Sequence, residues 1–219
     1  MRNYIAEFIG TFAMIFCGTG AIIVNQEANG AITHLGISII FGLIVMSMIY
    51  ALGNISGAHF NPAVTIAFTV AKKFQAKQVL PYIISQLLGA VLASATLYFL
   101  FPKNEMLGAT LPTGTELQAF VLEFIITFIL MFVILCVAHG SKEQGMFAGI
   151  AIGSAVLLLA LFAGPICGAS MNPARSFAPA LISNHLEHIW VYIVAPIFGA
   201  ISSVFIWKYI NENEEIKIN

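Results

Sequence analysis

The tripeptide Asn-Pro-Ala occurs twice in this chain, as Asn61-Pro62-Ala63 and as Asn172-Pro173-Ala174. Each copy closes a longer matching phrase, Ser-Gly-Ala-His-Phe-Asn-Pro-Ala over 56–63 and Cys-Gly-Ala-Ser-Met-Asn-Pro-Ala over 167–174. Asn is a preferred helix N-cap, and Pro is favoured at the first helical position, where its missing N–H is not needed. Each tripeptide therefore predicts the start of a helix. Between strongly apolar segments, the pair predicts two short helices whose positive ends face a shared interior.

The apolar segments around these tripeptides predict a membrane protein. The chain is 59% hydrophobic and 9% charged, with a mean hydropathy of +0.93, whereas soluble domains carry roughly 45–50% apolar and about 25% charged residues. A span needs about 20 residues, and apolar stretches of suitable length predict six spans at 4–24, 36–53, 80–101, 118–139, 147–163 and 189–210. The net charge of −1 leaves no basic patch, so we expect contact with membrane lipid and none with nucleic acid.

Landmarks shared by the two halves predict an inverted repeat. Residues 6–12 parallel residues 122–128, and Tyr-Ile followed by Gly-Ala recurs at 82–90 and at 192–200. Repeats of three spans, at about 4–101 and 120–210, must enter the membrane from opposite faces. The segments 54–71 and 164–181 are too short to span and are predicted to be re-entrant. The expected fold is an all-α membrane protein, one channel domain over 1–219, with six transmembrane helices and two re-entrant half-helices.

Positive charge predicts the orientation of the chain. Most cations fall before the first span, in the second and fourth connections, and at or after the last span: Arg2, Lys72, Lys73, Lys77, Lys142, Lys208 and Lys217. Only Lys103 is a free loop cation on the other side. The positive-inside rule then places both termini in the cytoplasm, and we expect the plasma (cell inner) membrane.

The meeting point of the half-helices predicts a passive channel. If the side-chain oxygens of Asn61 and Asn172 cap their helices, both amide NH₂ groups stay free to donate to one central water. Two helix ends with roughly half a positive charge each repel cations there, while an uncharged solute meets hydrogen-bonding partners. Backbone carbonyls of the preceding extended stretches are expected to line the path: Ala58, His59, Phe60, Ser170 and Met171.

Glu7 and Glu123 are the acidic residues within the predicted spans. Intramembrane carboxylates are functional candidates, and two roles are possible. Each could accept hydrogen bonds from the backbone of its own re-entrant loop, which we favour because the pair recurs with the loops. Alternatively, the two could relay protons in a proton-coupled small-solute transporter. An enzyme is not expected, because the chain has no Asp and no nucleophile–base pair. Cys17, Cys136 and Cys167 lack ligand spacing, so no metal site is predicted, and Cys167 is expected in a loop.

The motifs at 56–65 and 172–176, with the repeated Glu at 7 and 123, make residues 4–210 resemble the aquaporin (major intrinsic protein) superfamily. The resemblance implies an aquaporin-like fold, a homotetramer with one pore per subunit, no cofactor and no chemical reaction. It also implies an outer selectivity filter, which motif spacing places at Phe41, Ala160, Ala169 and Arg175.

The filter and its neighbouring phrases suggest the solutes. Strict water channels of this superfamily typically carry His at the position of Ala160, and glycerol channels usually carry Asp where Ser176 stands. The phrases Phe-Ala-Gly-Pro at 162–165 and Gly-Ala-Ser-Met at 168–171 look most like the nodulin-like intrinsic branch. That resemblance implies a channel for water with glycerol, urea or metalloid hydroxides. A strict water-selective aquaporin is the alternative.

Overall fold

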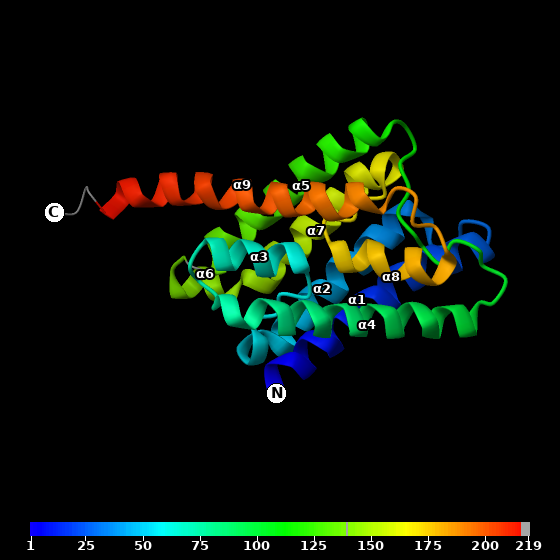
Figure 1. Ribbon diagram of the computed structural model, residues 1–219, viewed down its shortest axis with the longest axis horizontal. Helices are drawn as coiled ribbons and strands as arrows, with labels where there is room; N and C mark the ends of the chain where they lie inside the picture. The colour runs from blue at the N-terminus through cyan, green and yellow to red at the C-terminus, as the bar shows by residue number, and fades with distance from the viewer. Residues whose placement is uncertain (139, 216–219) are drawn as a thin grey trace.

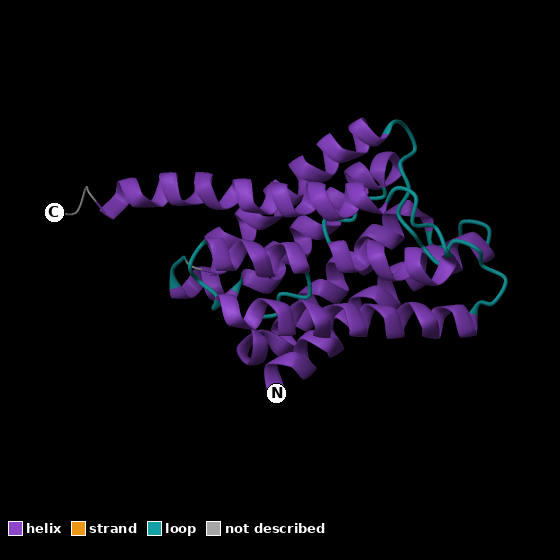
Figure 2. Ribbon diagram, in the orientation of Figure 1, coloured by secondary structure: helices purple, strands orange, loops and turns teal. Residues whose placement is uncertain are grey.

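The computed structural model describes residues 1–138 and 140–215, and over these residues it is helical without any strand (Figure 2). Within these described residues, six helices are long and apolar enough to cross a membrane: α1 (Arg2–Glu27), α2 (Thr33–Ser56), α4 (Val79–Leu100, preceded by the 3-10 turn η1, Ala76–Gln78), α5 (Glu116–Ala138), α7 (Ala148–Cys167) and α9 (Ile189–Glu215). The six predicted spans are confirmed. Residue 139, the predicted end of the fourth span, and Lys217 lie outside the described residues.

The two half-helices begin where the sequence predicts. α3 (Pro62–Val70) follows Asn61, whose side-chain oxygen accepts a 2.9 Å hydrogen bond from the backbone N–H of Ala63. α8 (Pro173–Ser183) follows Asn172, whose side chain accepts from Ala174 at 3.0 Å and from Arg175 at 3.4 Å. Both Asn residues have extended backbones with φ of −154°. The predicted N-caps are therefore confirmed.

The end of α7 differs from the prediction. The helix continues through Pro165 to Cys167, so the expectation that Cys167 lies in a loop was wrong. Gly168, with φ of +83°, ends the helix instead, and its N–H donates to the carbonyl of Gly164. The N–H and hydroxyl of Thr113 then bond the carbonyls of Ile166 and Pro165. Thr113, in the connection between α4 and α5, thus supplies donors for carbonyls in the last turn of α7. Such a contact between distant segments cannot be seen in the sequence pattern.

A further short helix, α6 (Lys142–Met146), was not predicted. It lies in the connection between α5 and α7 and begins with a capping box. The Ser141 hydroxyl accepts from the Gln144 N–H, and the Gln144 side chain accepts from the Ser141 N–H. Reciprocal capping of this kind pairs two backbone N–H groups at the start of a helix.

Matched packing relates the two halves of the chain. α1 packs against α2 and α4, α5 packs against α7 and α9 in the same way, and α2 crosses α7. A β-carbon added at Gly89 would overlap the Phe8 carbonyl, and one added at Gly199 would overlap that of Phe124. Small residues allow such close helix contacts in lipid. We therefore propose the repeats at about 4–101 and 120–210 as the two structural units of the domain.

The half-helices lie in the middle of this bundle. In Figure 1, α3 and α8 run between the long helices, whereas α9 extends beyond the body of the molecule towards the C-terminus. α3 packs on α4 and α9, and α8 packs on the same two helices. Each half-helix is therefore held by one long helix from each half of the chain, and this brings their N-terminal ends together.

Candidate pore and selectivity constriction

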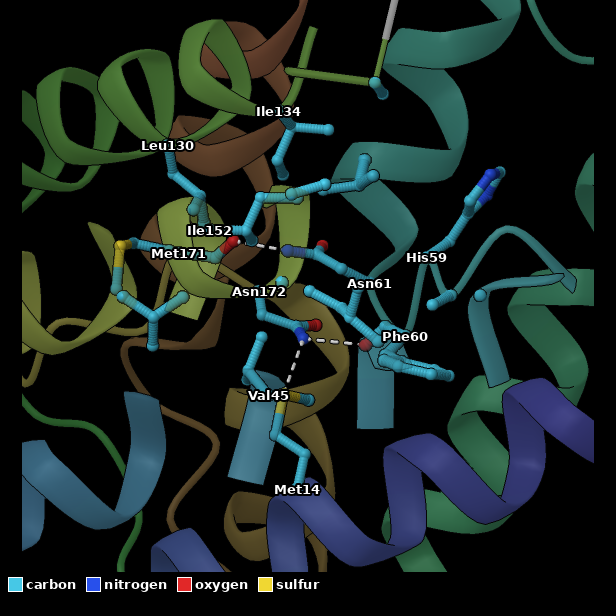
Figure 3. Close-up of a pocket in the computed structure, with 18 of the residues that line it drawn as sticks. Met14, Val45, His59, Phe60, Asn61, Leu130, Ile134, Ile152, Met171 and Asn172 are labelled. Atoms are coloured by element: carbon cyan, nitrogen blue, oxygen red, sulfur yellow. Dashed lines mark hydrogen bonds between the residues drawn. The ribbon is translucent and has the colours of Figure 1, made fainter. Parts of the chain in front are cut away.

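The two half-helices meet through a reciprocal pair of hydrogen bonds (Figure 3). The Asn61 side-chain nitrogen donates to the carbonyl of Met171 at 2.7 Å, and that of Asn172 donates to the carbonyl of Phe60 at 2.9 Å. Phe60 and Met171 both have positive φ, 49° and 54°. Each Asn therefore caps its own helix with oxygen and holds the opposite loop with nitrogen.

This pairing corrects the expectation that both amide NH₂ groups stay free. An Asn amide carries two hydrogens, and each Asn uses one of them on the facing loop. The second hydrogen of Asn172 is directed at the sulfur of Met14, 3.9 Å from the nitrogen. Sulfur is a weak acceptor, so a water oxygen can displace it. Asn61 and Asn172 thus each retain one amide hydrogen for a bound water or solute. For the hydrogen of Asn172, that molecule competes with the sulfur of Met14.

A cavity of about 610 Å³ passes this junction. Both Asn residues line it, together with the residues whose carbonyls were predicted to face the path: Ala58, His59, Phe60, Ser170 and Met171. Long helices supply apolar side chains to the same cavity, among them Val45, Leu130, Ile134 and Ile152 (Figure 3). The cavity therefore carries polar groups from the two loops and apolar groups from the spans.

A second cavity of about 280 Å³ adjoins the first, and a small set of residues separates them. Of the described residues, four line both cavities, and they are those that motif spacing placed at the filter: Phe41, Ala160, Ala169 and Arg175. The two Ala residues offer only methyl groups. The boundary between the cavities thus consists of one aromatic ring, one guanidinium and two methyls.

Arg175 is buried, with 3% of its surface exposed, and its position is held from two sides. Its Nη1 donates to the carbonyl of Gly108 at 2.7 Å. Its guanidinium carbon lies 5.3 Å from the centroid of the Phe41 ring, within the range of a cation–π contact. Gly108 belongs to the connection between α4 and α5. Sequence reasoning missed it, because a backbone carbonyl acceptor has no side-chain signature.

Glu7 supports the first re-entrant loop through four hydrogen bonds. Its Oε1 accepts from the hydroxyl of Ser56 at 2.7 Å and the N–H of His59 at 2.9 Å. Its Oε2 accepts from the N–H of Phe60 at 2.7 Å and from the Gln86 side chain at 2.8 Å. The side chain is fully buried. The carboxylate therefore ties α1 to the loop that ends at Asn61.

Glu123 makes the matching contacts in the second half. It accepts from the N–H groups of Ser170 and Met171 at 2.7 and 2.8 Å, and from the thiol of Cys167 at 3.3 Å. It is also fully buried. Of the described residues that line the two cavities, none is acidic. Glu7 and Glu123 thus face the loops rather than the path.

Two further features of the site were missed by sequence reasoning. A chain of hydroxyls runs from Thr110 to Ser176, then to Ser170, and ends on the carbonyl of Asn172. It joins the α4–α5 connection to the tip of the second loop. Met14 is the other feature. Its place two helical turns after Glu7, on the same face of α1, was the signal that would have found it.

Six membrane-spanning helices, two half-helices joined at paired amides and a cavity that passes between them define a membrane channel. The chain belongs to the major intrinsic protein family, whose model matches residues 1–207. The family is one of transport channels, so the prediction that the chain is not an enzyme is confirmed, as is the resemblance on which the filter was placed.

Individual relatives agree with this assignment. The chain is 51% identical over 210 residues to "Aquaporin NIP1-1" of Oryza sativa subsp. japonica, covering 95% of this chain and 73% of that protein. It is 47% identical over 216 residues to "Nodulin-26" of Glycine max, covering 98% and 80%. Among solved structures, the aquaglyceroporin from Plasmodium falciparum matches with a TM-score of 0.86 and 28% identity, covering 98% of each chain.

Proposed function

We propose that this protein is a passive channel that conducts water and small uncharged solutes such as glycerol, and that excludes protons and other ions. The observation that carries the proposal is the path itself. The larger cavity is lined by polar groups of the two re-entrant loops, including the paired Asn61 and Asn172 amides, and by apolar side chains of the long helices. A neutral polyol has hydroxyl groups, which the polar groups can bind, and a carbon chain, which can contact the apolar side chains. Urea and metalloid hydroxides belong to the same class of small neutral solutes.

Ion exclusion follows from the charges at the junction. The starts of α3 and α8 each carry roughly half a positive charge, and Arg175 adds a full one at the boundary between the cavities. A cation that enters must lose hydration where the potential is positive, with no carboxylate among the described lining residues to replace its water. A central water held by the retained hydrogens of Asn61 and Asn172 has its own hydrogens directed outward along the path, which interrupts proton transfer.

The contacts of the two buried glutamates argue against the rival proton-coupled transporter. We propose that Glu7 and Glu123 are loop supports, because each accepts hydrogen bonds from the loop N–H groups and neither lines either of the two cavities described above. A relay needs a carboxylate that exchanges protons with the path. Ala160 and Ala169 argue against a strictly water-selective channel, because their methyl groups leave more space at the boundary between the cavities than larger side chains would.

We further propose a homotetramer in the plasma (cell inner) membrane, with one pore per subunit and both termini in the cytoplasm. Family membership supports the tetramer. The orientation is supported by Lys72, Lys73 and Lys77 in the α3–α4 connection and Lys208 near the end of α9, opposite Lys103.

Ala160→His tests the proposed solute range. An imidazole at this position narrows the boundary and adds a donor, so we expect water permeability within about twofold of the parent and glycerol permeability lower by about tenfold. Stopped-flow light scattering on proteoliposomes measures both, and Ala160→Ser, which changes little volume, is the matched control. Unchanged glycerol permeation in the His variant contradicts the assignment of the constriction.

A further inference from the structure

Pro165 leaves one carbonyl of α7 without its helical partner. Proline has no N–H, so the carbonyl of Leu161, four residues earlier, lacks its usual donor within the helix. At membrane depth, an unpaired carbonyl is costly, because no bulk water replaces the missing donor. The carbonyls of Pro165 and Ile166 accept hydrogen bonds from the hydroxyl and the N–H of Thr113, and the carbonyl of Gly164 accepts one from the Gly168 N–H. The Leu161 carbonyl needs a donor from elsewhere.

His34 of α2 supplies that donor. Its Nε2 lies 2.9 Å from the Leu161 carbonyl oxygen. A carbonyl only accepts, so Nε2 carries the hydrogen in this contact. Gly164 makes room for the imidazole, since a β-carbon there would lie 2.6 Å from the His34 Cε1. Pro165, His34 and Gly164 thus form one arrangement: the first lacks the N–H, the second supplies the donor and the third leaves space for the imidazole.

This arrangement lies beside the proposed constriction. His34 and Gly164 line the smaller cavity together with Phe41 and Ala160. Ala160 directly precedes Leu161 in α7, and Phe41 lies two helical turns after His34 in α2. One hydrogen bond thus joins the two helices that carry Phe41 and Ala160, close in the sequence to both residues.

We propose that His34 is a positioning residue for solute selectivity: it replaces the N–H that Pro165 lacks, and so holds the Leu161 turn of α7, and with it Ala160, in place. The proposal rests on the proposed function, since it takes these residues to form the constriction. Without the imidazole donor, the outer end of α7 moves until Leu161 finds water, and Ala160 moves with it. The channel then discriminates less sharply between solutes of different width.

His34→Phe tests the proposal, because it keeps an aromatic ring and removes the donor. The readout is the ratio of erythritol to glycerol permeability in proteoliposomes, and we expect it to rise about fivefold, the ratio that corresponds to one net hydrogen bond. Water permeability stays within about twofold, because water passes either width. His185→Phe is the matched control; His185 bonds Ser183 locally, and its ratio is expected to stay at the parent value.

Pro165→Ala separates positioning from simple packing. The substitution returns an N–H to the Leu161 carbonyl, so the double variant His34→Phe/Pro165→Ala is expected to regain the parent ratio. Pro165→Ala alone is expected to leave the ratio unchanged. An unchanged ratio in His34→Phe overturns the proposal, and so does a raised ratio that Pro165→Ala fails to restore.

A spectroscopic measurement tests the contact between His34 and Leu161 independently of whether the channel conducts glycerol. If the parent conducts no glycerol, the proposed function fails. The ¹⁵N spectrum of histidine-labelled protein in bilayers then decides the positioning contact, with His34→Phe used to assign the signal. An Nε2–H signal of His34 with a hydrogen-bond shift supports the contact. An Nε2 without hydrogen, or an Nε2–H without a hydrogen-bond shift, overturns it.

Discussion

Replacing either buried glutamate by glutamine keeps its shape, but the structure predicts unequal losses of stability. At Glu123, one carboxylate oxygen accepts from Ser170 and Cys167, and the other accepts from Met171. The new NH₂ group must face one of the two backbone N–H groups, donor against donor. The thiol is a weak acceptor for it. Glu123→Gln therefore leaves two buried donors unpaired.

At Glu7 the neighbours can adapt. If the new NH₂ group takes the place of the oxygen that Ser56 and His59 share, the Ser56 hydroxyl can turn to accept from it and donate within its own helix. The remaining oxygen keeps its bonds from Phe60 and Gln86, so only the backbone N–H of His59 is lost. With about 2 kcal/mol for each unpaired buried donor, Glu7→Gln costs about 2 kcal/mol and Glu123→Gln about 4 kcal/mol.

Unfolding by SDS in mixed micelles, followed by the fluorescence of Trp190 and Trp207, measures the two free energies. Glu7→Asp and Glu123→Asp are the controls for shortened carboxylates. Water permeability per folded channel is expected to survive both Gln substitutions. A Glu7→Gln loss equal to or larger than that of Glu123→Gln refutes the reasoning from Ser56, and loss of all flux in folded Gln variants favours a proton-coupled mechanism.

Two further predictions concern single contacts. Met14→Leu removes the sulfur that competes for the second hydrogen of Asn172, so water permeability by stopped flow is expected to rise about twofold, from a contact worth a fraction of a net hydrogen bond; a fall in permeability contradicts this. Tyr82→Phe removes a 2.9 Å hydrogen bond to the carbonyl of Ser56, so it is expected to lower the free energy of unfolding by about 1 kcal/mol. Tyr192→Phe is expected to leave the free energy of unfolding unchanged, because the Tyr192 hydroxyl has no hydrogen-bond partner among the described residues. Equal losses in the two Tyr variants contradict the second prediction.

The helices of this fold were predictable because their signals are local. Apolar length gives the spans, and Asn followed by Pro gives the starts of α3 and α8, since the cap and the first turn are neighbours in the sequence. The exception was α7, whose span was predicted to end at residue 163 but which continues to Cys167. A distant imidazole supplies one missing donor there, and Gly168 sets the actual end.

The site was predictable in its members and less so in its bonds. Motif spacing placed Phe41, Ala160, Ala169 and Arg175, and the structure brings all four to the boundary between the cavities. Their roles in selectivity remain proposals. Several bonds of the site that sequence reasoning missed end on main-chain carbonyls or on sulfur, as with Asn172, whose amide donates to the carbonyl of Phe60 and to the sulfur of Met14. A carbonyl is present at every residue, so its use in one bond leaves no mark in the sequence.

We propose that paired amides between two positive helix ends admit neutral molecules and stop protons. A pH gradient and an osmotic gradient applied to the same proteoliposomes test this, with an internal pH dye followed together with light scattering. Water and glycerol fluxes are expected to rise with the protein content while the proton leak stays at the level of protein-free vesicles. A proton leak that rises in proportion to the protein content contradicts it.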